Sequence, residues 1–170
     1  GSAECLLDTG ARAVETGDAP RVEATRQGFQ GGLAEAEEQG NEGWAAWLQA
    51  GSDALDAYAA WQNGDLGGAD RAMRAIQLRP EAMFGLSGRL RLWLGTLAAQ
   101  EGRFEDASQY FASLANTELG WYGVLQEARA LRDSGDDQAA SDAYRRFLDL
   151  WSEAPVDHVF VVEARQATGG

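Results

Sequence analysis

Histidine and cysteine, which build many nucleophilic catalytic sites, are scarce in this chain. His158 is the only histidine and Cys5 is the only cysteine. A Ser-His-Asp or Cys-His arrangement within one chain would therefore have to be built around His158. No nucleophile accompanies this histidine in a recognisable motif, so we expect a solvated or helix-capping residue. Cys5 has no basic neighbour in the sequence that would activate its thiol.

The sequence patterns typical of metal and phosphate sites do not occur. There is no Cys-x2-Cys pair, no His-Glu-x2-His and no Asp-x-Asp-x-Asp-Gly loop. The glycine pairs at 31–32 and 67–68 lack the Gly-x-Gly-x2-Gly spacing that cradles phosphates. The acidic run between Glu35 and Glu42 has the composition of a solvated helix face. We therefore predict no catalytic residue, no metal site and no cofactor, and a protein that is not an enzyme.

One short segment has the composition of a catalytic motif. Residues 6–11, Leu-Leu-Asp-Thr-Gly-Ala, resemble the Asp-Thr-Gly-Ala segment of retroviral-type aspartic proteases. In that family two chains each supply one aspartate, and the two carboxylates share a proton. The protease fold needs β-strands on either side of the motif, whereas an Ala-rich helical sequence follows here. We therefore expect Asp8 to be a solvated residue of a first helix, and we reject the protease.

Charge and length narrow the classes of protein further. The chain has 170 residues, with 27 acidic side chains against 14 basic ones and a net charge of −13. Such acidity opposes binding to nucleic acid or to anionic lipid. No apolar run approaches the ~20 residues that a membrane span needs. The sequence predicts a helix-rich, acidic chain that folds as one domain or as one continuous repeat array.

Three segments share a repeated pattern that begins with a glycine. Apolar or small residues follow each glycine at +2, +5, +9 and +12, with only Asp137 departing from that character. The segments are Gly64 with Leu66, Ala69, Met73 and Ile76; Gly102 with Phe104, Ala107, Phe111 and Leu114; and Gly135 with Asp137, Ala140, Tyr144 and Phe147. A glycine in the left-handed conformation ends one helix. The small residue then lets a neighbouring helix approach, and the large one fills the space beyond it.

This pattern resembles the tetratricopeptide repeat (TPR), a helix–turn–helix unit of ~34 residues. The second-helix half of the motif matches at Ala69-x3-Met73, Ala107-x3-Phe111 and Ala140-x3-Tyr144, and Leu94-Gly95 stands at the family's Leu-Gly place. The first-helix half departs more, with Arg91 at the Trp place and Ala98 at the Tyr place. The resemblance covers residues 50–151 and implies an all-α, right-handed solenoid of about eight or nine helices. We expect irregular helical units over 3–49, three repeats over 50–155 and a capping helix over 156–168.

Capping and stop signals place the helices of the N-terminal third. Gly17 ends a first helix, and Asp18 is a plausible N-cap for the next one, which Gly40 ends. A further helix starts after Asn41, with Gly51 and Ser52 as the candidate break. No run alternates with period two, so we predict no sheet.

The TPR resemblance also implies where a partner would bind. In that family the first helices of the repeats line the concave surface on which partner peptides lie. The corresponding residues here are Tyr58, Trp61, Arg89, Gln100, Tyr122, Arg129 and Arg132. Guanidinium groups suit carboxylates, so an acidic peptide or a C-terminal carboxylate is the expected ligand. The alternative is that these arginines pair with the many acids of the chain itself.

The sequence supports three hypotheses about function. The first is a protein-interaction or scaffold module that binds a partner peptide in the groove. The second is a structural subunit that assembles head to tail with copies of itself, as an oligomer or an extracellular filament. Its apolar last helix contains Val159, Phe160, Val161 and Val162, of which at most two can face the chain's own array. The third is the regulatory tail of a larger bacterial signalling protein, because residues 135–155 are similar to the helical-repeat tails of such regulators.

Overall fold

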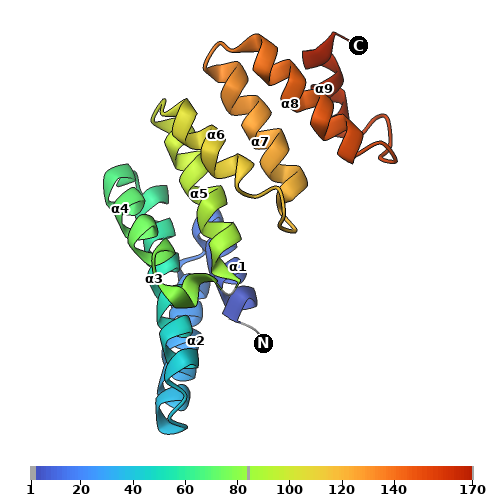
Figure 1. Ribbon diagram of the computed structural model, residues 1–170. Coiled ribbons are helices and arrows are strands. Elements are labelled where there is room, and N and C mark those ends of the chain that lie inside the picture. Colours follow the sequence, from blue (N-terminus) through green and yellow to red (C-terminus); the bar gives the residue numbers. More distant parts are fainter. Residues whose placement is uncertain (1–2, 84, 170) are drawn as a thin grey trace. The chain divides into compact units, whose positions relative to one another are not determined.

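The computed structural model describes residues 3–83 and 85–169, and these residues form helices without any strand (Figure 1). The prediction of an all-α fold is confirmed. Nine α-helices and one 3₁₀ helix (η1) lie within the described ranges, in the following order: α1 Ala3–Thr16, α2 Ala19–Glu38, α3 Glu42–Gln62, α4 Leu66–Gln77, η1 Pro80–Met83, α5 Leu86–Gln100, α6 Phe104–Ala112, α7 Gly120–Asp133, α8 Asp137–Leu150 and α9 Val159–Thr168. None of these helices has the length and apolar character needed to cross a bilayer.

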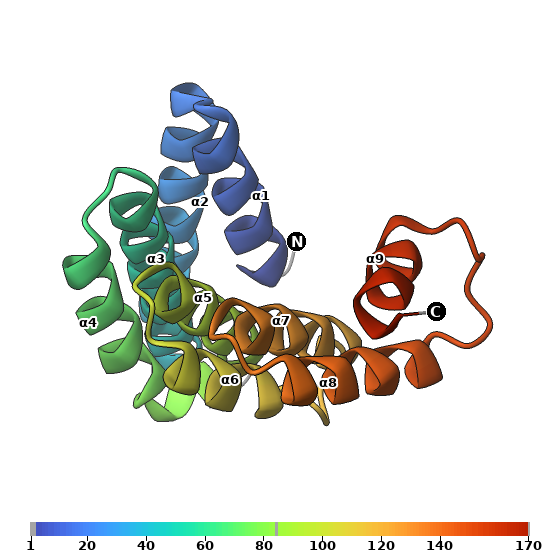
Figure 2. The ribbon, with the colours of Figure 1, turned by 90° about the horizontal axis from the view of Figure 1, so that it is seen from above.

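The chain divides into two compact units, Gly1–Leu90 and Arg91–Gly170, with the boundary inside α5. In the first unit α3 packs against α1, α2 and α4, and α1 also packs along α2 (Figure 2). In the second unit α7 packs against both α6 and α8, and α8 contacts α9. The expectation that the repeats form one continuous array stays a prediction.

The helix boundaries of the N-terminal third follow their capping residues. Gly17 and Gly40 have φ values of +69° and +65° and end α1 and α2. The Asp18 side chain accepts a hydrogen bond from the main-chain N–H of Arg21 at 3.1 Å. Asn41 caps α3 in the same way. The predicted starts of α2 and α3 are therefore confirmed.

The candidate break at Gly51 and Ser52 does not occur, because α3 runs unbroken through both residues. Gly51 is buried, and the ring of Phe29 from α2 occupies the space where a side chain would lie. A Cβ atom at this position would stand 2.8 Å from Cε1 of Phe29. Here the glycine allows two helices to approach closely, and it does not interrupt the helix.

The glycine-led pattern adopts the local structure that the sequence predicts. The turn glycines Gly64, Gly102 and Gly135 have φ values of +91°, +73° and +86°. The small and large positions of each second helix are buried at 3% exposure or less, and they are Ala69, Met73, Ala107, Phe111, Ala140 and Tyr144. The exception, Asp137, lies in the first turn of α8, where the helix dipole stabilises a negative charge.

The second unit ends in a helix that folds back onto the preceding pair. Residues 151–158 connect α8 to α9, which Figure 2 shows as a long loop before the returning helix. The first helical residue is Val159, three positions later than the expected start at 156. His158 is the N-cap of this helix, and its Nδ1 atom accepts the N–H of Phe160 at 3.3 Å. Val161 and Ala164 of α9 are buried.

Candidate protein-interaction surface

Two arginines and a tyrosine from α7 and α8 converge on one carboxylate of α9. Arg129 donates from Nε to Oε1 of Glu163 at 2.8 Å and from Nη2 to Oε2 at 2.6 Å. Tyr144 donates its hydroxyl to Oε1 at 3.0 Å. Arg132 donates to the Tyr144 oxygen at 3.1 Å and lies 3.8 Å from Oε1. Arg129 thus forms a bidentate ion pair with Glu163, and the Tyr144 hydroxyl is a third donor, which binds Oε1.

The charge state of this cluster is fixed by its contacts. The hydrogen bond from Arg129 lowers the pKa of Glu163, against the opposing effect of burial. The hydrogen bond with Glu163 raises the pKa of Arg129, again with burial acting the other way. Burial, together with its hydrogen bond to Glu163, raises the pKa of Tyr144 to about 12. At neutral pH the cluster therefore holds an ionised carboxylate, a charged guanidinium and a neutral phenol.

Beside this cluster, an aromatic surface receives the ring of Phe160. The ring centroid lies 6.2 Å from those of Trp121 and Trp151 and 6.4 Å from that of Tyr122. The guanidinium carbon of Arg129 stands 5.6 Å from the Phe160 ring centre, within the range of a cation–π contact. Arg129 therefore contacts both the acidic and the aromatic side chain of α9.

The outer side of α9 is different in character. Val159 and Val162 are 66% and 37% exposed, whereas Val161 is buried. Phe160 packs against a buried core of the second unit, which consists of Leu125, Ala128, Ala143, Tyr144, Phe147 and Ala164. Of the four apolar residues assigned to self-assembly, two thus face the chain itself and two face outward. Val159 and Val162 are three residues apart and share one side of the helix.

The remaining residues assigned to the groove lie in different surroundings. Tyr58 is buried on α3, donates its hydroxyl to Oε1 of Glu15 at 2.6 Å and packs edge-on against Trp61. Burial and this hydrogen bond raise the pKa of Tyr58. Arg89 of α5 donates to Oδ1 of Asp8 at 2.5 Å. The last assigned residue, Gln100, is exposed at the end of α5.

Asp8, His158 and Cys5, the residues first considered for catalysis, lie outside any arrangement of catalytic groups among the described residues. Asp8 lies on α1 with its side chain 53% exposed, as expected for a solvated helix residue. His158 caps α9 and packs edge-on against Trp151, and Cys5 is exposed. Across residues 3–83 and 85–169, no three His, Cys, Asp or Glu side chains gather in a way that could hold a metal ion. The prediction that the protein has no catalytic or cofactor site stays a prediction.

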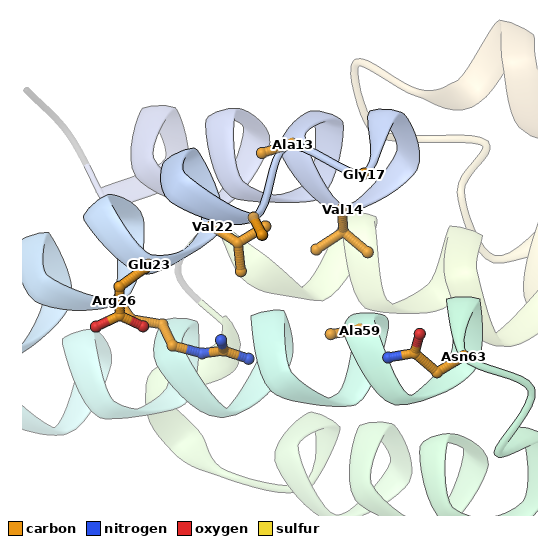
Figure 3. A pocket seen from close by; sticks show the side chains of 9 residues that line it. Ala13, Val14, Gly17, Val22, Glu23, Arg26, Ala59 and Asn63 are labelled. Atoms are coloured by element: carbon orange, nitrogen blue, oxygen red, sulfur yellow. The ribbon is translucent and has the colours of Figure 1, made fainter.

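The first unit also contains a hollow of about 470 Å³ between the end of α1, the start of α2 and the end of α3 (Figure 3). Its wall is mostly small and apolar, and Val14, Val22 and Ala59 face the space. Arg26, the cation among its described lining residues, donates from Nε and Nη2 to Oδ1 of Asp56 at 2.9 and 2.7 Å. The hollow thus offers shape but little directed polar chemistry.

Sequence reasoning assigned Arg129 and Arg132 to a common face but missed Glu163 and Tyr144. One signal was available, because Phe160 and Glu163 are three residues apart and therefore lie on the same side of a helix. The arginines that they would meet could not be read from the sequence. That pairing depends on how α9 folds back over α7 and α8.

No protein-family model matches the chain, and no curated protein has significant sequence similarity to it. The function must therefore be inferred from the residues and contacts of the chain itself.

Proposed function

We propose that this protein is a non-enzymatic interaction module, built as a right-handed TPR-like solenoid, which binds an acidic peptide segment of another protein. The binding surface is the side of α7 and α8 that carries Tyr122, Arg129, Arg132 and Tyr144. The partner segment contributes a carboxylate to the arginines and an apolar or aromatic side chain to the adjoining rings.

The repeat part of the proposal is supported by local geometry. Each of the three glycine-led turns has the left-handed backbone that ends a first helix in a helix–turn–helix unit. One further departure from the TPR pattern has a physical explanation. In the third repeat Glu127 stands at the family's Leu place, where it is buried and pairs with Arg146 of α8 at 3.1 Å. An ion pair there takes the place of an apolar contact.

The observation that carries the binding part is the bidentate contact of Arg129 with a carboxylate presented by a helix. This contact supports the proposal, because the donors of this surface already hold a carboxylate of the chain itself in a planar fork. The Arg129 side chain is 28% exposed and that of Arg132 is 47% exposed. A carboxylate from a partner can therefore reach the same donors once Glu163 moves aside.

A selection with random peptides tests this proposal without knowledge of the natural partner. The full chain is immobilised and exposed to a displayed library of 12-residue peptides, and enriched sequences are compared with those selected by Arg129→Ala/Arg132→Ala. We expect acidic sequences to be enriched on the unmodified chain and lost on the double variant. Arg145→Ala is the matched control, because Arg145 is exposed and its ion pair within the described part of the chain is with Asp142 of the same helix. Enrichment that is not acidic, or that survives the double substitution, would contradict the proposal.

One observation favours self-assembly as a second candidate function. Val159 and Val162 leave an apolar strip on the outer side of α9, which a second copy of the chain could cover. Light scattering over a dilution series would show a mass above the 18.3 kDa of one chain, and Val159→Ser/Val162→Ser would return it to that value. Met83→Ser is the control, because Met83 is equally apolar and 75% exposed but lies in the other unit. A mass of one chain at every concentration would exclude this candidate.

A further inference from the structure

We infer that the α7–α8 surface is a receptor for one kind of partner: an amphipathic helix that presents an aromatic ring and a glutamate one turn apart. In this chain α9 is the helix that occupies the receptor. The inference rests on the proposed function and specifies the partner that such a surface would recognise.

The contacts of α9 define which side chains the receptor recognises. Only Val161 and Ala164 of its ten residues are fully buried, and neither has a polar group or a large ring. The directed contacts come from two side chains, Phe160 and Glu163. Phe160 lies among the rings of α7 and the α8–α9 connection, and Glu163 receives the donors described above.

The spacing of these two side chains is set by helix geometry. Residues three apart lie on one side of a helix, with Cβ atoms about 5–6 Å apart. Arg129 spans this separation, because its guanidinium group contacts the Phe160 ring and both oxygens of Glu163. One receptor residue therefore reads both features, and a segment that has the ring and the acid on opposite sides of its helix cannot satisfy it.

Charge and attachment explain why a partner could replace α9. The receptor contributes two arginines and a neutral tyrosine, so an acidic segment complements it, although the protein as a whole is acidic. The Glu163 side chain keeps a quarter of its surface exposed, so water can reach the contact as it opens. Residues 151–158 connect α9 to α8. Ala164 and Phe160 of α9 share a core with α7 and α8, but α7 and α8 also pack directly against each other, so on this inference they keep that interface when a partner replaces α9.

The test weakens the contacts of α9 by substitution and adds a separate peptide with the sequence of this helix. In the full chain, Phe160→Ala/Glu163→Ala removes both directed contacts of α9. A fluorescein-labelled peptide with the sequence of residues 156–168 is then titrated against this variant, with fluorescence anisotropy as the readout. We expect saturable binding, and we expect the peptides carrying Phe160→Ala or Glu163→Gln to bind roughly tenfold more weakly or worse, because each loses a charge-assisted or ring contact. A peptide of the same composition in scrambled order should not bind.

The controls separate failure of this inference from failure of the proposed function. Circular dichroism tests whether the double variant is folded. If the double variant is unfolded, full-length Glu163→Gln serves as the receptor instead. A folded variant that binds no peptide, or binds the substituted peptides equally well, would overturn the inference. The proposed function would stand if the random library still gave acidic peptides that depend on Arg129 and Arg132. If the library gave none, the proposed function itself would fall.

Discussion

The ion pair between Arg129 and Glu163 should contribute measurably to folding, and a double-mutant cycle can isolate that contribution. The cycle compares the unmodified chain with Arg129→Ala, with Glu163→Ala and with both substitutions together. Hydrogen bonds to charged groups contribute about 1.5–3 kcal/mol when buried, whereas exposed ion pairs contribute about 0.2–1 kcal/mol. The two side chains are 28% and 25% exposed and are joined by two short hydrogen bonds. We therefore expect a coupling of roughly 1–2 kcal/mol at pH 7.

The coupling should also depend on pH in a defined direction. The pKa of Glu163 is lowered in the folded chain, chiefly by the hydrogen bond from Arg129. A group of this kind stabilises the fold fully above its unfolded pKa of about 4.3 and loses that contribution as the pH falls through the folded value. The coupling should therefore persist at pH 5 and decline as the pH falls below the ordinary glutamate range. Protonation of other carboxylates affects all four proteins alike and cancels in the cycle.

Urea denaturation of the four proteins at pH 7 and at acidic pH supplies the free energies of unfolding. Amide hydrogen exchange of α9 shows in addition whether the loss is local to this helix. A coupling below about 0.3 kcal/mol at pH 7, within the usual error of additivity, would refute the reasoning. A coupling that grows on acidification would refute the assigned direction of the pKa shift.

Four further predictions concern single residues, each checked by the free energy of unfolding. Gly31→Ala should stabilise the chain by about 0.5–1 kcal/mol, because Gly31 lies inside α2 with open space around it. Gly51→Ala, also in a helix, should destabilise it by about 1–3 kcal/mol, because the new methyl group would meet the Phe29 ring. Tyr144→Phe should cost about 0.5–1.5 kcal/mol of folding free energy by removing the hydroxyl that binds the α9 carboxylate. In the unmodified chain an ultraviolet titration should show the Tyr144 phenol ionising only near pH 12. Its contribution to the free energy of unfolding should be full below about pH 10 and should be lost as the pH rises toward 12. Asp136→Ala should cost about 1 kcal/mol, because its carboxylate caps α8.

Much of the fold could be predicted because its signals are local. A positive φ at Gly64 requires only that the residue lacks a side chain, and the N-caps at Asp18 and Asn41 bind main-chain N–H groups three residues away. The buried stripe of each second helix depends on the helical period, which the spacing of apolar residues gives directly. Short-range interactions of this kind need no information about distant parts of the chain.

Gly51 marks the limit of such reasoning within the fold. A glycine in a helix lowers its propensity by about 1 kcal/mol, which made a break plausible. The packing of Phe29 against that position outweighs the loss, and the phenylalanine comes from a different helix 22 residues earlier in the chain. Only the tertiary structure could decide between a break and a close contact, because both are compatible with the same local sequence.

The candidate surface shows the same division between sequence and tertiary structure. That Arg129 and Arg132 share one side of α7 follows from their spacing alone, since the helical period fixes which residues are neighbours. The spacing of Phe160 and Glu163 likewise places them on one side of the last helix. The tertiary structure decided that these two sides meet, through a connection of residues 151–158 whose path no local rule specifies. Whether an arginine is available to a partner or already holds an acid of its own chain depends on that meeting.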